Sequence, residues 1–362
     1  MYSWYGKSTW LGAFLMDNRR LSVIQRSVII MKYCIIAEVR ESYPSLLSTE
    51  KVYNDYVSKK SMLDLVDGIR NAGYDCHFMG GIKELYNLYE SQSSYDDIIF
   101  INYNYGVPAQ YKRVQGPALL EVMKAKYSGS DPFVSLLVND KAYCKKVLAQ
   151  AHILTPNAFL LYDKSSINTY LNKNHLMTPL VLKPNTEGSS LGIDKDCLCL
   201  SYESAITKAT LLLEKYPQIL AEEYIEGYEC TVWIMGNKTN FPFIKPLIIS
   251  CDKQYYFQKR IFTMEDKANH VKDYDIPSNH LPLELVNQLE TISKTIFIEL
   301  GLRDYARIDY RIKDGQIYFL EINALPIFSK TSEIGAISQL YNISYSEICN
   351  TLVSVIQNRL MS

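Results

Sequence analysis

Four polar side chains near the C-terminal end occur in two pairs, and the members of each pair are two residues apart. Arg307 and Asp309 lie in one apolar stretch, and Glu321 and Asn323 lie in the next. The segment RIDYRIKDGQIYFLEIN predicts two β-strands joined by a turn. Because strand side chains alternate between two faces, each pair shares a face. Carboxylate and amide oxygens beside an arginine suit a site for Mg²⁺ and phosphate. The alternative is an ordinary hairpin with a solvated polar face.

The register of this hairpin sets a condition on its loop. Asp309 and Glu321 face the same way only if the loop has an odd number of residues, because a slip of one residue exchanges the faces. A two-residue Asp314-Gly315 turn would separate the carboxylates. We therefore predict a three-residue loop, residues 313–315, with Gly315 in the left-handed conformation.

Two further segments have residue types that suit a nucleotide. In PLVLKPNTEGSSLG (179–192), a strand ends at Lys183 and a loop of small residues, 187–190, follows. Small residues let backbone N–H groups approach an anion, and the lysine adds a point charge for phosphate. In AEEYIEGYECTV (221–232), a connector offers backbone groups for adenine and acids for ribose hydroxyls. Alone, the first segment is also typical of a turn and the second of a hydrated acidic loop.

The order of these segments along the chain is more specific than any one of them. Lys141 opens a helix, then come Lys183 with its glycine loop, the acidic connector and the polar hairpin. At this point the chain resembles the ATP-grasp enzymes, and most closely the D-alanine–D-alanine ligase family. The resemblance covers roughly residues 95–357. Its most specific motifs are KPNTEGSSLG, EEYIEGYE and ARIDYRIKDGQIYFLEINALP.

The resemblance implies a nucleotide site that holds ATP between two lobes. Its residues would be Lys141 and Lys183 for the phosphates, Glu187, Gly188, Ser189 and Ser190 in a loop that closes over them, Glu222 and the backbone near Ile225 for adenine, and Glu229 for ribose.

The resemblance also implies a metal and catalytic site. Asp309, Glu321 and Asn323 would bind two Mg²⁺ ions, with Mn²⁺ as a substitute, and Arg307 would stabilise the oxyanion of a tetrahedral intermediate. Three more residues would assist the substrates and the phosphates: Ser189, Ser332 and Lys259.

The implied activity is an ATP-dependent carboxylate–amine ligase that joins two amino acids through an acyl phosphate, as in peptidoglycan or peptide biosynthesis. The same chemistry on another amino acid or a hydroxy acid stays open. So do a non-catalytic ATP-binding protein and a small-molecule kinase on the same fold. The implied fold is α/β and α+β, with a parallel-sheet N-terminal domain and two ATP-grasp lobes. The expected divisions are 1–30 (extension), 31–133, 134–228 and 229–362.

The chain departs from the family in its first domain. The family segment HGxxGEDGxxQG corresponds to YGVPAQYKRVQG (105–116), so Tyr105 replaces the histidine and Gln110-Tyr111 replace the acidic pair. An acid for the ammonium group of the first substrate has no clean match, and Glu38 or Glu41 is the candidate. These changes lie on the amino-acid side of the site, whereas the ATP and metal side is intact.

Composition narrows the partners. The chain has 362 residues, of which 48% are hydrophobic and 21% charged, and its net charge is −1. Nothing in this balance indicates a nucleic-acid or membrane partner. The eight cysteines are dispersed, which favours reduced thiols in the cytoplasm. Small-molecule amino acids are the expected partners, and a homodimer is possible.

Hydrophobic patterning predicts alternating elements from residue 31 onward. Strands are expected at 33–39, 97–104, 158–162, 179–183, 218–223 and 229–235, and helices at 61–72, 115–125, 140–151, 206–215, 282–300 and 344–360.

Overall fold

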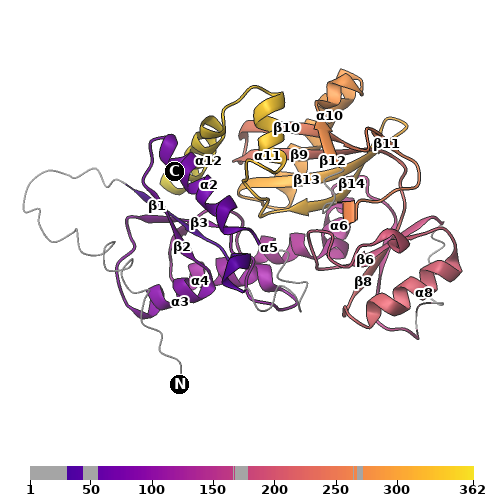
Figure 1. Ribbon diagram of the computed structural model, residues 1–362, viewed down its shortest axis with the longest axis horizontal. Helices are drawn as coiled ribbons and strands as arrows, with labels where there is room; N and C mark the ends of the chain where they lie inside the picture. The colour runs from indigo at the N-terminus through magenta and orange to yellow at the C-terminus, as the bar shows by residue number, and fades with distance from the viewer. Residues whose placement is uncertain (1–30, 44–55, 166, 168–177, 264, 267–271) are drawn as a thin grey trace, which may run out of the picture. The chain divides into compact units, whose positions relative to one another are not determined.

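The computed structural model describes residues 31–43, 56–165, 167, 178–263, 265–266 and 272–362 (Figure 1). The predicted extension, residues 1–30, lies outside the described residues. Residues 32–362 form one compact unit, and its described part contains three β-sheets.

The first sheet is parallel, as the alternating pattern predicts, with strand order β2-β1-β3-β4. β1 and β3 are almost entirely buried because both of their faces are covered. Figure 1 shows α2 on one side of this sheet, and α3 and α4 on the other. The elements are β1 (Lys32–Ile36), α2 (Lys59–Asn71), β2 (Cys76–Gly80), α3 (Ile82–Glu90), β3 (Ile98–Asn102), η4 (Lys112–Val114), α4 (Gln115–Val122) and β4 (Lys126–Tyr127).

The second sheet is small and antiparallel, with strand order β5-β8-β6-β7. Helix α8 covers it, and the two share an aliphatic core. The elements are α6 (Lys141–Gln150), β5 (Ala158–Leu161), β6 (Leu180–Pro184), β7 (Leu198–Cys199), α8 (Tyr202–Leu213) and β8 (Ile219–Glu223).

The third sheet is the largest, with strand order β12-β10-β9-β13-β14, and β11 pairs with β9. Helices α5 and α10 pack against it around a core that includes Ile234, Ile308 and Phe297. The elements are α5 (Pro132–Asn139), β9 (Gly227–Asn237), β10 (Asn240–Cys251), β11 (Tyr256–Phe257), β12 (Lys272–Asp275), α10 (Leu283–Glu299), β13 (Asp304–Lys313) and β14 (Gln316–Asn323).

The last two helices connect this sheet to the first one. α11 (Glu333–Leu340) follows β14, and α12 (Tyr345–Met361) packs against α2. The contact is close, since a Cβ added at Gly68 of α2 would lie 2.5 Å from Cε1 of Tyr345. The C-terminal helix therefore packs against α2 of the N-terminal sheet domain and also against β9 and β13 of the large sheet.

The hairpin of β13 and β14 corrects one prediction. The loop is not three residues long: Lys313 pairs with Gln316, and Asp314 and Gly315 form a two-residue turn with φ values of 50° and 75°. The register shifts by one residue further along, where Tyr310 faces Phe319 but Asp309 faces Glu321. A bulge in β14, rather than the turn, thus brings the two carboxylates to the same face.

Each predicted strand and helix has a counterpart whose ends differ by a few residues. The sequence reading missed β10, in which Pro242 and Pro246 break the strand pattern. β12 pairs only with residues 248–251 of β10. Both prolines lie before this segment, where β10 is the edge strand of the sheet and a proline is tolerated because no further strand needs its N–H. The sequence reading also missed the shorter elements β2, α3, β4, α5, β7, β11, β12 and α11.

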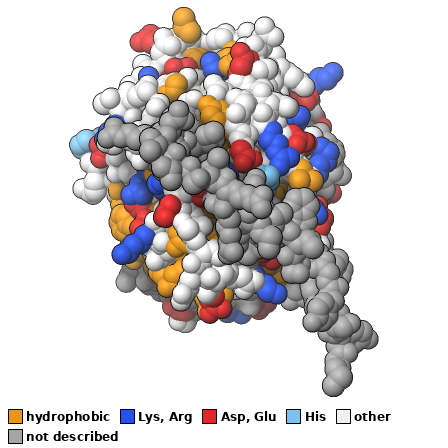
Figure 2. Space-filling model, turned by 90° about the vertical axis from the view of Figure 1, so that its left-hand side faces the viewer, with side chains coloured by type: hydrophobic (Ala, Val, Ile, Leu, Met, Phe, Trp, Pro, Cys, Tyr) orange, Lys and Arg blue, Asp and Glu red, His pale blue; other side chains and the backbone are white. Residues whose placement is uncertain are grey.

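The surface matches the balanced composition. On the face drawn in Figure 2, basic and acidic side chains are interspersed over the described residues. No helix in the described part of the chain is long and apolar enough to cross a bilayer.

Candidate active site

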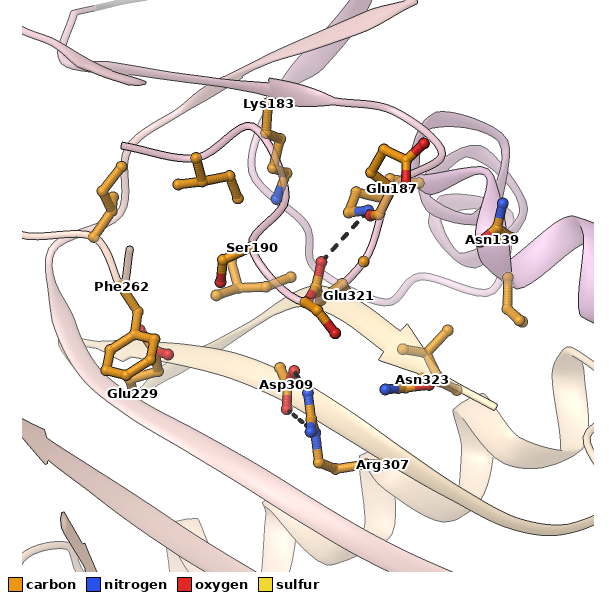
Figure 3. Close-up of a pocket in the computed structure, with 18 of the residues that line it drawn as sticks. Asn139, Lys183, Glu187, Ser190, Glu229, Phe262, Arg307, Asp309, Glu321 and Asn323 are labelled. Atoms are coloured by element: carbon orange, nitrogen blue, oxygen red, sulfur yellow. Dashed lines mark hydrogen bonds and ion pairs between the residues drawn. The ribbon is translucent and has the colours of Figure 1, made fainter. Parts of the chain in front are cut away.

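A cavity of about 310 Å³ opens between the small sheet and the large one (Figure 3). It brings together nearly all residues that the sequence assigns to a site. Those that line it are Lys141, Lys183, Glu187, Gly188, Ser189, Ser190, Glu222, Ile225, Glu229, Arg307, Asp309, Glu321, Asn323 and Ser332. Lys259 is exposed and lies outside this lining.

The polar face of the hairpin forms one wall. Arg307 is paired in register with Asn323, and Asp309 with Glu321. Arg307 donates from Nε and Nη2 to the two oxygens of Asp309, at 3.1 and 2.9 Å. Thr231 Oγ1 donates to Oδ1 of the same carboxylate at 2.5 Å. Figure 3 shows Asp309, Glu321 and Asn323 directed into the space below Lys183 and Glu187.

The oxygens of this wall suit a hard cation. Two carboxylates and the Asn323 amide lie on one face of two adjacent strands, and Lys141 Nζ lies 3.7 Å from Glu321 Oε2. No group of three or more His, Cys, Asp or Glu side chains is placed to bind a metal among the described residues. Mg²⁺ does not need such a group, because it usually takes one or two carboxylates and completes its shell with phosphate and water. The donor set therefore fits Mg²⁺ accompanied by a phosphate.

A buried acid between two lysines forms the opposite wall. Glu222 lies 2.5 Å from Lys183 Nζ through one oxygen and 3.2 Å from Lys145 Nζ through the other. Burial would raise the pKa of Glu222, but the two ammonium groups hold it below its ordinary value. In Lys183, burial is outweighed by Glu222 and Glu321, so its pKa is raised. The ion pair between Lys183 and Glu222 therefore keeps the Lys183 ammonium charged where it faces the cavity.

Sequence reasoning missed Lys145. It lies four residues after Lys141 on α6, and side chains at that spacing share a helix face. The spacing of four between Lys141 and Lys145 could have predicted that both lysines face the site. The structure gives Glu222 an ion-pairing role with both lysines in addition to the adenine contact that the family resemblance implies.

The loop over the cavity has strained backbone. Ser189 and Ser190 adopt φ values of 52° and 59°, which side chains disfavour, and such conformations concentrate at functional sites. The Lys141 ammonium donates to the carbonyl oxygens of Glu187 and Asn185. Burial lowers the pKa of the Lys141 ammonium. Glu321 opposes this shift, whereas the positive charges of Lys183 and Arg113 add to it. The loop is thus tied to the first turn of α6.

The far end of the cavity has a second ion pair. Arg311 Nη2 lies 2.7 Å from Glu229 Oε2, and the two residues are directly opposite each other on β13 and β9. Sequence reasoning missed Arg311, although it shares the face of Arg307 and Asp309 by its spacing of two. Tyr224, whose ring lies under the Arg311 guanidinium, and Ile225 complete this end.

The near end is formed by the start of α11. Ser332 caps the helix, and its hydroxyl is within hydrogen-bond distance of the carbonyl oxygens of Ile327 and Ser329. The adjacent Glu333 carboxylate accepts from Tyr274 at 3.0 Å and lies 3.5 Å from Arg307 and 3.6 Å from Lys272. Burial would raise the pKa of Glu333, but Arg307 and Lys272 lower it to about 2. The sequence reading did not include Glu333.

The N-terminal domain reaches the cavity with a cation. Arg113 lies 4.7 Å above the Tyr105 ring and donates to Asn323 Oδ1 at 3.3 Å, and the Tyr105 hydroxyl donates to the Leu325 carbonyl. Neither candidate acid lines the cavity. Glu38 accepts from the Ile82 amide, and Glu41 accepts from the Lys59 amide.

Comparison with known proteins identifies the family. The family profile described as "D-ala D-ala ligase C-terminus" matches residues 150–354. A D-alanine–D-alanine ligase of Bordetella avium is 30% identical over 306 residues, which cover 82% of this chain and 89% of the relative. The D-alanine–D-alanine ligase of Aquifex aeolicus is 28% identical over 302 residues, which cover 82% of this chain and 95% of the relative.

Solved structures show the same fold. The D-alanine–D-alanine ligase of Bacillus anthracis in complex with ATP superposes with a TM-score of 0.67 at 21% identity, over 91% of this chain and 98% of that one. The VanG D-Ala:D-Ser ligase of Enterococcus faecalis superposes with a TM-score of 0.65 at 18% identity, over 90% of this chain and 99% of that one. The family match spans more than half of the chain, and the ATP-grasp fold is the predicted one. The chain therefore belongs to the D-alanine–D-alanine ligase family of ATP-dependent ligases.

Proposed function

We propose that this protein uses ATP to join the carboxylate of one amino acid to the amine of a second, as a D-alanine–D-alanine-type ligase. The position of Arg307 is the main support. Its guanidinium lies in the same cavity as Lys141 and Lys183, beside the carboxylates of the hairpin. Binding a nucleotide does not require a cation at this end, whereas a guanidinium here can stabilise the negative charge that develops on a carbonyl oxygen.

The residues divide into a nucleotide part and a metal part. Lys141, Lys183 and the 187–190 loop would hold the phosphates, and Glu229 with the backbone near Ile225 would hold the nucleoside. Asp309, Glu321 and Asn323 would hold Mg²⁺. When bound, Mg²⁺ neutralises charge on the phosphoryl group that is transferred.

The reaction consists of two displacements. An oxygen of the donor carboxylate attacks the γ-phosphorus of ATP, and the bond to the leaving ADP oxygen breaks. The acceptor amine then attacks the acyl carbon and loses a proton, and Arg307 would stabilise the oxyanion that forms. The C–O bond to phosphate breaks last, and phosphate leaves. Ser332, at the start of α11, would help to seat the carboxylate of the acceptor.

The lining of the cavity favours a first substrate other than free D-alanine. Of the N-terminal domain, the described residues that line the cavity include Arg113 but no carboxylate. An ammonium group would meet a cation there, unless a residue outside the described part of the chain provides an acid. Ligation of another amino acid or a hydroxy acid is therefore the second candidate.

A product assay tests the proposal. The protein is incubated with ATP, Mg²⁺ and pairs of D- and L-amino acids and hydroxy acids, phosphate release is followed, and products are identified by mass spectrometry. A ligase releases phosphate and forms a condensed product. A kinase leaves the phosphoryl group on its substrate, and a non-catalytic ATP-binding protein gives neither result. The reaction uses ATP, and all eight cysteines are unpaired, so we place this activity in the cytoplasm.

A further inference from the structure

The N-terminal domain contributes a guanidinium group to the reaction centre. Arg113 belongs to the short helix η4, and its side chain lines the cavity. Its Nη1 atom lies 3.3 Å from Oδ1 of Asn323, and its Cζ atom lies 4.7 Å from the centre of the Tyr105 ring. The ring and the Asn323 amide both contact the guanidinium, which restricts its position beside the end of β14.

Arg113 also contacts the loop over the cavity. A Cβ atom added at Gly188 would lie 2.3 Å from Nη2 of Arg113, so a side chain at position 188 would displace the guanidinium. The preceding residue, Lys112, places its ammonium 3.5 Å from Oε2 of Glu187. Two consecutive residues of η4 therefore meet two consecutive residues of the loop. Arg113 occupies the point where this loop approaches the end of β14.

The charges at this point favour an anion with several oxygens. Arg113, Lys141 and Lys183 all line the same cavity, so three cations face the space under the loop. Glu222 and Glu321 pair with the two lysines, and an anionic phosphoryl group placed between the three cations would be attracted to each of them. A guanidinium presents paired N–H donors that match two oxygens of a phosphate.

We propose that Arg113 binds the transferred phosphoryl group, first while it passes from ATP to the donor and then within the carboxyl phosphate. This inference rests on the proposed function, which supplies that intermediate. In the first step, the donor oxygen bonds to phosphorus and the electron pair of the broken P–O bond stays with ADP. In the second step, the C–O bond breaks and its electron pair leaves with phosphate. Arg113 donates hydrogen bonds to non-bridging oxygens in both steps and keeps its proton.

Three variants test this role. Arg113→Gln removes the charge, and Arg113→Lys keeps it without the planar fork. Arg303→Gln is the matched control, because Arg303 pairs with Asp131 and does not line the cavity. The first measurement is donor-dependent ADP formation, with hydroxylamine trapping the carboxyl phosphate as a hydroxamate. The second is the Kd of ADP with Mg²⁺, determined with and without aluminium fluoride, which imitates the phosphoryl group in transfer.

We expect Arg113→Gln to lower kcat about 10²-fold, as for other lost groups that stabilise transition-state charge. Its KM for ATP should change less than about threefold, Arg113→Lys should recover part of the loss, and Arg303→Gln should match the wild type. The tightening of ADP binding by aluminium fluoride should fall at least about tenfold in Arg113→Gln, while binding of ADP alone is retained.

The two measurements separate the two proposals. Ligation by the wild type with an unchanged aluminium fluoride effect in Arg113→Gln overturns the role of Arg113 and leaves the proposed function intact. If the wild type makes no hydroxamate and no ligated product, but aluminium fluoride tightens ADP binding only when Arg113 is present, phosphoryl binding by Arg113 is supported and the ligase activity is contradicted. Equal losses in Arg113→Gln and Arg113→Lys, with a weaker affinity for ADP alone, identify a packing role and also overturn the inference.

Discussion

Replacing Lys145 by methionine should destabilise the protein through one buried charge. The Lys145 side chain is only 5% exposed, and its ammonium lies 3.2 Å from both Glu222 Oε2 and the Phe319 carbonyl oxygen. Methionine keeps most of the apolar stem but removes both interactions. Breaking a buried ion pair from one side costs about 3–5 kcal/mol. Lys183 still neutralises the other Glu222 oxygen at 2.5 Å, so we expect about 3 kcal/mol. That loss is a large part of a typical stability of about 5–15 kcal/mol.

Urea unfolding near pH 7, followed by far-ultraviolet circular dichroism and by fluorescence of the buried Trp233, measures this loss. Lys146→Met is the matched control, since Lys146 is the next residue of α6 and is exposed. It should change stability by no more than about 0.5 kcal/mol. The Glu222 pKa is depressed in the folded protein, so its stabilising contribution is present above its unfolded pKa and is lost at lower pH. The difference between the two variants should therefore shrink on acidification. If Lys145→Met is as stable as Lys146→Met at pH 7, the reasoning fails.

Three other outcomes follow from the site. Arg307→Ala should cut turnover about 10²–10³-fold and leave the Kd of ATP nearly unchanged; normal turnover with weakened ATP binding would contradict the oxyanion role. Glu333→Gln should lower stability at neutral pH by up to about 3 kcal/mol, because the Glu333 pKa falls from 4.5 unfolded to about 2 folded. That loss should diminish between pH 4.5 and 2, and a pH-independent difference in thermal unfolding would refute it. D-Alanine should be a poor first substrate, with a KM at least about tenfold above that of the best donor, the factor that 1.4 kcal/mol represents. Steady-state kinetics in which D-alanine surpasses every other donor would show that Glu38, Glu41 or another acid compensates.

The hairpin illustrates how much of the site is encoded locally. Spacings of two put Arg307 with Asp309 and Glu321 with Asn323, whatever the rest of the fold does. The relation between the two strands was harder to predict. We expected the turn to set the register, but the turn has two residues and the bulge in β14 restores the match. Bulges have no strong signature in a run such as Phe319-Leu320-Glu321, so the correct face was predicted for the wrong reason.

Other site residues depend on contacts between distant segments. Arg113 meets Asn323 across 210 positions of sequence, and its value to the site appears only when η4 and β14 are both in place. Lys145 had a local signal, its spacing of four from Lys141, but its partner Glu222 lies on another element. Glu333 follows a predicted site residue directly. Sequence alone does not show that its side chain turns toward Arg307 rather than toward solvent.

The cations of the cavity are held in position by acids on the protein itself. Lys183 is held by Glu222, Arg307 by Asp309 and Glu333, and Lys141 lies 3.7 Å from Glu321. Groups that are already oriented lose little free energy to reorganisation when charge develops on a substrate, which is the main source of electrostatic catalysis. Arg113 lies over the Tyr105 ring and donates to the amide oxygen of Asn323. It also comes from the N-terminal domain, whereas the others come from the ATP-grasp lobes. Lys112 and Arg113 already contact the 187–190 loop, so the proposed role of Arg113 makes this contact part of the site, and Arg113→Gln tests whether the N-terminal domain takes part in the reaction.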